Sequence, residues 1–161
     1  MRQVGHIFQK EFKAYFVSPI AYIVISIFIL VTGWFFFSTF FIYDQATLRN
    51  FFGLLPATFS FVIPAITMRL FSEELNVGTY EILLTMPVSF REIVLGKFFA
   101  SVVFVAAMLL PTIAYPITIS FLGELDWGPV AGGYIGAILL GSAFSAIGLF
   151  ASSLTRNQIT A

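Results

Sequence analysis

Long apolar stretches alternate with short polar ones along the chain. Four stretches contain no Asp, Glu, Lys or Arg and are mostly apolar: Ala14 to Tyr43, Asn50 to Met68, Phe98 to Gly123 and Trp127 to Thr155. A helix needs about 20 predominantly apolar residues to cross a bilayer. The pattern therefore predicts four membrane-spanning helices separated by short polar connections.

These interruptions set the expected boundaries of the elements. We predict an all-α, polytopic membrane protein with a single transmembrane domain over residues 1–161. The expected elements are an interfacial helix at 2–17, spans at 19–43, 50–71, 91–122 and 127–154, and a cytoplasmic segment at 72–90.

The N-terminal helix is predicted to be amphipathic. Its apolar face is formed by Val4, Ile7, Phe8, Phe12, Tyr15 and Phe16. Such a pattern is typical of a helix that lies on the surface of a membrane. Glu11 is the exception, because the helical repeat places it inside the apolar arc. Two interpretations are open: the carboxylate pairs with a cation on another subunit, or it reaches the lipid headgroups.

Composition supports a lipid environment. The chain is 59% hydrophobic and 10% charged, whereas soluble domains contain about a quarter charged residues. The net charge is zero and no basic block is present, which gives no electrostatic footprint for nucleic acid. With no cysteine and a single histidine, a thiolate or histidine-cluster metal centre is excluded, and we expect no metal and no cofactor.

The distribution of Lys and Arg predicts the orientation. If the N-terminus is cytoplasmic, the cytoplasmic cations are Arg2, Lys10, Lys13, Arg69, Arg91, Lys97 and Arg156. Only Arg49 then lies outside. An excess of cations in cytoplasmic segments is the usual sign of topology. We therefore expect a multi-pass protein with its N-terminus in the cytoplasm.

The fourth span contains two rows of small residues at four-residue spacing. One row is Gly128, Gly132 and Gly136, and the other is Gly133, Ala137, Gly141 and Ser145. Small residues at this spacing let helix backbones approach closely. We predict helix packing through Gly132, Gly133, Gly136, Ala137 and Gly141, either within the chain or against another subunit.

Four carboxylates and two cations are concentrated in "SEELNVGTYEILLTMPVSFREIVLGKF", residues 72–98. Thr79 can cap a short helix that ends near Met86, before Pro87. Ser89 and Glu92 have the spacing of a capping box at the start of the third span. The segment is either a rigid helix that transmits force from a soluble partner or a solvated loop that only enforces topology. Local features leave both open.

The same segment resembles the cytoplasmic signature of ABC-2 type transporter permeases. It is most similar to the small bacterial group that includes gliding-motility-associated permeases. The opening "KEFKAYFVSPIAYIV" also resembles the start of that group, and "SSLTRNQITA" resembles its entry into a fifth span. The family usually has six spans and this chain has four, so it looks like a truncated chain or an incomplete segment. The resemblance to this bacterial group also implies a location in a bacterial inner membrane.

The resemblance implies an exporting permease subunit that forms a homo- or heterodimer, contacts membrane lipid and binds a cytoplasmic ABC ATPase subunit. The segment after the second span would be the coupling helix. Carried over to this sequence, the ATPase contacts would be Glu11, Glu74, Gly78, Thr79, Tyr80, Glu81 and Leu84.

Other functions are weighed against this one. The four long apolar runs contain no Asp, Glu, Lys or Arg that could couple transport to protons or ions. Energy for transport should therefore enter from outside the membrane. Gly96-Lys97 is not a phosphate-binding loop, because Arg91 and Phe98 replace required residues. An intramembrane hydrolase would need more acid-base partners than the chain offers, so we expect no enzyme and no catalytic residue. A non-transporting membrane scaffold is the remaining alternative, and docking of an ATPase distinguishes the two.

Overall fold

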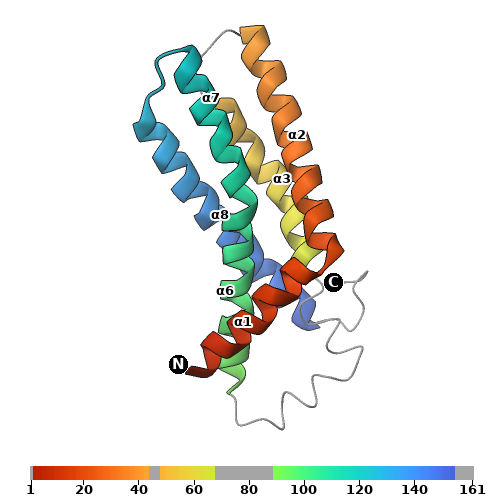
Figure 1. Ribbon diagram of the computed structural model, residues 1–161. Coiled ribbons are helices and arrows are strands. Elements are labelled where there is room, and N and C mark those ends of the chain that lie inside the picture. The colour runs from red at the N-terminus through yellow and green to blue at the C-terminus, as the bar shows by residue number, and fades with distance from the viewer. Residues whose placement is uncertain (1, 44–47, 68–88, 155–161) are drawn as a thin grey trace.

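The computed structural model describes residues 2–43, 48–67 and 89–154, and these residues are almost entirely helical (Figure 1). Their helices are α1 (Arg2–Val17), α2 (Pro19–Tyr43), α3 (Arg49–Thr67), α6 (Phe90–Leu109), α7 (Ala114–Leu122) and α8 (Trp127–Leu154). A short 3₁₀ helix, η1 (Leu110–Ile113), joins α6 to α7. The described part of the chain contains no β-strand.

Four helical segments are long and apolar enough to cross a membrane. They are Pro19–Ser38, Arg49–Thr67, Arg91–Leu122 and Trp127–Leu154. Large apolar side chains cover the outside of α2 and α8, including Leu30, Trp34, Leu139 and Phe150. Extended apolar surfaces are rare on soluble monomers. The predicted all-α, polytopic membrane fold with four spans is confirmed.

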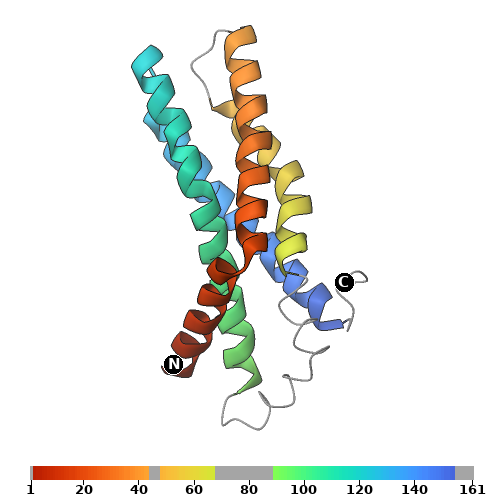
Figure 2. The same cartoon turned by 45° about the vertical axis from the view of Figure 1, so that its right-hand side comes forward.

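The helices form a bundle with two distinct ends. α2, α3, α7 and α8 gather at one end, whereas α1 crosses α6 at the other, as the two views show (Figures 1 and 2). We call these the loop end, which holds the α7–α8 connection, and the α1 end. α1 is separated from α2 by Ser18, and Pro19 is the first residue of α2. Proline suits this position, where no helical donor is needed.

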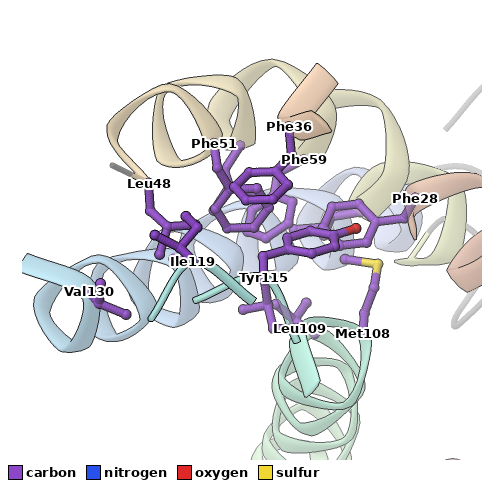
Figure 3. Packing of buried hydrophobic residues seen from close by; sticks show 14 residues of the cluster. Phe28, Phe36, Leu48, Phe51, Phe59, Met108, Leu109, Tyr115, Ile119 and Val130 are labelled. Atoms are coloured by element: carbon purple, nitrogen blue, oxygen red, sulfur yellow. The ribbon is translucent and has the colours of Figure 1, made fainter. Parts of the chain in front are cut away.

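An aromatic core holds the loop end together (Figure 3). The Tyr115 ring of α7 stacks on Phe36 of α2 at 4.7 Å between centroids and meets Phe51 of α3 edge-on at 5.6 Å. Phe28 and Phe59 lie 5.9 Å apart in the same cluster and are 1% and 0% exposed. Aromatic pairs contribute about 0.5–1.5 kcal/mol beyond their burial. The cluster contains residues of all four spans, including Val130 and Ala137 of α8.

Small residues of α8 allow other helices to approach closely. A Cβ atom placed on Gly141 would lie 2.6 Å from Val105 Cγ1 of α6. A Cβ on Gly133 would collide with the Phe52 ring of α3. Ala137 lies between these glycines in the sequence and is buried. This row of α8 therefore faces the inside of the chain.

The row of small residues that contains Gly132 and Gly136 faces outward. A Cβ atom on Gly132 or Gly136 would meet no other heavy atom of the described chain within 4 Å. Both residues are exposed. Their predicted role in helix packing remains a prediction, and it would require a partner other than the helices described here.

The two rows provide a matched test of packing. Gly141→Leu is expected to destabilise the protein by about 1–3 kcal/mol, because the new side chain overpacks the α6–α8 contact. Gly136→Leu places the same side chain on the same helix in open space and is expected to leave stability nearly unchanged. Thermal unfolding in a mild detergent, followed by circular dichroism, measures both. Equal effects of the two variants would contradict the packing described.

Candidate functional site

Charged side chains of the described chain concentrate at the α1 end. Lys10, Glu11 and Lys13 lie on α1, and Arg91, Glu92 and Lys97 lie in the first turns of α6. The segment at 68–88 immediately precedes α6 in the sequence and lies outside the described residues. The contact between α1 and the start of α6 is therefore the candidate functional site that can be examined in atomic detail.

One face of α1 fits along α6. Ile7 lies against Gly96, where an added Cβ would come within 2.6 Å of Ile7 Cγ2. Two turns further along α1, the Tyr15 ring stacks on Phe104 of α6 at 5.0 Å between centroids. Residues four apart lie on one side of a helix, so Glu11 lies on this face, midway between Ile7 and Tyr15. The absence of a side chain at Gly96 lets the two helices come this close.

Glu11 forms a buried ion pair with Lys97. The Lys97 ammonium donates to Glu11 Oε1 at 3.1 Å. Lys97 is 1% exposed and Glu11 is 7% exposed. Lys10 lies 3.8 Å from the same carboxylate oxygen, and its side chain is largely exposed. The Glu11 carboxylate thus has a buried cationic partner, Lys97, and a second, exposed cation, Lys10, at the rim of the contact.

Burial makes the two charges depend on each other. Several kcal/mol are needed to bring each ion out of water, and mutual attraction offsets this cost only when the geometry is good. A charge left alone at such a position has neither water nor a partner. The pair therefore favours the one arrangement of α1 on α6 in which both charges are satisfied.

This contact adds to what was expected of both residues. Lys97 was predicted only as one of the cytoplasmic cations, and the structure shows that it lies in α6 and is buried. Glu11 was expected to seek a cation of another subunit or the lipid headgroups, yet its carboxylate contacts Lys97 of its own chain. A lone carboxylate on an apolar face and a cation next to an apolar run are the signals that could have suggested the pair.

The start of α6 is fixed by a capping box, as predicted. The Glu92 N–H donates to Ser89 Oγ at 3.4 Å, and the Ser89 N–H donates to Glu92 Oε2 at 3.1 Å. The Ser89 hydroxyl also donates to Glu92 Oε2 at 3.1 Å. This arrangement satisfies backbone donors that have no partner within the helix. The helix therefore begins at a defined residue directly after the charged segment.

The other predicted ATPase contacts fall outside the described residues: Glu74, Gly78, Thr79, Tyr80, Glu81 and Leu84. Their role stays a prediction, as does that of Glu11 toward a partner. Among the residues that the structure describes, no three His, Asp or Glu side chains gather in a group that could hold a metal ion. The site is thus a mechanical contact between two helices, built from an ion pair, a cap and a close glycine approach.

Comparison with known families agrees with this picture of a helical membrane protein. A family model described as ABC-2 family transporter protein matches residues 43–161, which includes three of the four spans and the charged segment. No curated protein and no solved structure matches the chain.

The ion pair can be tested by removing one partner or both. Lys97→Met is expected to destabilise the protein by about 3–5 kcal/mol, because the Glu11 carboxylate loses its buried partner and keeps only Lys10 at the rim. The double variant Glu11→Leu/Lys97→Met should recover most of that loss. Lys13→Met removes an exposed cation of α1 and should change stability by less than about 0.5 kcal/mol. Unfolding is measured for the unchanged protein, these three variants and the single variant Glu11→Leu. Additive losses in the double variant would contradict the pair.

Proposed function

The chain belongs to the ABC-2 family of transporter proteins, and on that premise we propose that it is the permease subunit of an ABC exporter powered by a separate cytoplasmic ATPase. Family membership supports the transporter class and a multi-pass location in a membrane. Export, the ATPase partner and a bacterial inner membrane are parts of the proposal. The resemblance of residues 10–24 and 73–98 supports the further proposal of the gliding-motility-associated group.

We propose that the α1 end faces the cytoplasm. Lys10, Lys13 and Arg91 lie at this end. The loop end holds the exposed acidic residues Glu124 and Asp126. Cations in short connecting segments favour the cytoplasmic side. An ATPase would therefore meet the permease where α1, the start of α6 and the preceding charged segment lie.

The observation that carries the coupling proposal is the ion pair between α1 and α6. The proposed coupling segment at 72–90 includes Ser89, the N-cap of α6. Two turns later, Lys97 pairs with Glu11 of α1. A displacement delivered to the start of α6 would therefore be shared with α1, because separating the helices would break the buried ion pair.

In the proposed mechanism, closure of the ATPase subunits pushes the helix expected from Thr79 to Met86. The push enters α6 at its cap and moves α1 with it. The first, second and fourth spans then repack at the contact with a second permease subunit. The outward row of α8, with Gly132 and Gly136, offers a close-packing surface for that subunit.

Binding of the ATPase is the first test of the function. Purified full-length permease is mixed with candidate ATPase subunits of the same membrane, and both binding and stimulated ATP hydrolysis are measured. Glu81→Lys and Tyr80→Ala should weaken binding tenfold or more, since a like charge or a lost aromatic anchor at an interface costs about 1.4 kcal/mol or more. Glu124→Lys is the matched control, because it makes the same charge change at the loop end.

The outcomes separate permease from scaffold. Loss of stimulation in the coupling-segment variants but not in Glu124→Lys supports a coupling helix. Unchanged binding and stimulation in all three variants would contradict this role for the segment. Failure of every ATPase to bind in several detergents and nucleotide states would favour a membrane scaffold.

The cap of α6 tests how displacement enters the span. Ser89→Ala removes the hydroxyl that accepts from the Glu92 N–H and is expected to cost about 1 kcal/mol at the start of the helix. Binding of the ATPase should be retained, whereas stimulated hydrolysis should fall, because the first turn of α6 would fray under load. Ser120→Ala, an exposed serine of α7, is the control. Full stimulation in Ser89→Ala would show that the cap is not needed for coupling.

A further inference from the structure

The third span is interrupted near its middle. α6 ends at Leu109, the 3₁₀ helix η1 covers Leu110–Ile113, and α7 begins at Ala114. Pro111 lies in η1 and Pro116 lies in the first turn of α7. Proline has no backbone N–H, and 3₁₀ stretches within a helix often mark hinges. The interruption divides the span into two rods joined by a short segment, which we call the joint.

Pro116 leaves the joint without one of its helical hydrogen bonds, because proline has no backbone N–H. In a continuous α-helix the Thr112 carbonyl would accept from the N–H of residue 116, and Pro116 has none. The Ala114 N–H is shared between the carbonyls of Pro111 and Thr112. A bond that reaches back only two residues from Ala114 to Thr112 replaces the helical one poorly. Thr112 is fully buried, so water does not supply the missing donor.

A tyrosine of a neighbouring span supplies the missing donor to the Thr112 carbonyl. The Tyr134 hydroxyl of α8 donates to the Thr112 carbonyl at 2.9 Å and lies 3.1 Å from Thr112 Oγ1. Thr112 Oγ1 in turn donates to the Leu109 carbonyl at 2.7 Å. Each hydroxyl has one proton. Because the Thr112 proton is directed to Leu109, the Tyr134 proton is available for the Thr112 carbonyl.

The surroundings fix the position of this hydroxyl. The Tyr134 ring meets Phe52 of α3 edge-on, with 5.4 Å between centroids and an interplanar angle of 89°. Phe52 also fills the space beside Gly133, so the ring that holds Tyr134 is itself held by α8. The hydroxyl is therefore presented to the joint by two other spans.

We propose that Tyr134 is the latch of this joint: its hydroxyl replaces the donor that Pro116 lacks and fixes the angle between α6 and α7. The two rods have different attachments. α6 is tied to α1 through Glu11 and Lys97, whereas α7 is packed in the aromatic core through Tyr115. The hydrogen bond from Tyr134 to the Thr112 carbonyl determines whether α6 and α7 move as one rigid unit. Tyr134 acts through the Thr112 backbone and is a positioning residue.

The angle across the joint can be measured directly. The chain has no cysteine, so spin labels can be attached at Leu95→Cys and Phe121→Cys. These residues of α6 and α7 flank the joint and are 46% and 85% exposed. In lipid nanodiscs, double electron–electron resonance should give one narrow distance distribution for the otherwise unchanged protein. Tyr134→Phe should broaden it or shift its mean, while Tyr22→Phe, at an exposed tyrosine of α2, should not.

Two further variants separate the latch from general stability. Pro116→Ala restores an N–H to residue 116, so Tyr134→Phe should have little effect in that background. Thr112→Val keeps the carbonyl and is expected to retain a narrow distribution. An unchanged distribution in Tyr134→Phe overturns the proposal. The proposal is also overturned if Tyr134→Phe broadens the distance distribution equally in the Pro116 protein and in the Pro116→Ala variant. The effect would then not depend on the missing donor.

Discussion

The arrangement of the α1 end depends on one buried ion pair. Glu11 and Lys97 are almost completely enclosed, and the Lys97 ammonium donates to the Glu11 carboxylate at 3.1 Å. Moving α1 away from α6 would leave both charges in an apolar environment, which costs several kcal/mol per ion. The close approach at Gly96 and the stacking of Tyr15 on Phe104 add packing to this electrostatic constraint. α1 is thereby attached to a spanning helix.

This attachment gives the third span a particular place in the bundle. Its first half begins at a capping box and is tied to α1, and its second half is enclosed by the aromatic core. The joint between the halves lacks helical donors because of its prolines, and a side chain from α8 compensates at one carbonyl. In the proposed mechanism, a displacement passes from a soluble subunit into the membrane. The third span, with α6 attached to α1, α7 packed in the aromatic core and the joint between them, is suited to transmit such a displacement.

Features that are local in sequence could be predicted, and those that depend on distant residues could not. Long uncharged runs predict spanning helices because composition alone decides whether a helix is stable in lipid. The capping box is predictable because Ser89 and Glu92 are three residues apart. Glu11 and Lys97 are 86 residues apart, so nothing in either local pattern identifies the other as its partner. The contact of Tyr134 with Thr112 is likewise set by how α7 and α8 pack. The two rows of α8 look alike in sequence, and only the fold shows that one faces inward.

The most direct measurement of whether α1 and α6 act as one unit is stimulated ATP hydrolysis by the permease–ATPase complex carrying reversed charges. Glu11→Lys and Lys97→Glu each place two like charges in the buried contact, and each should abolish stimulation while the ATPase still binds. The double variant restores an ion pair with opposite polarity and should recover a large part of the stimulation. Normal stimulation in either single variant, or no recovery in a stably folded double variant, would contradict the account.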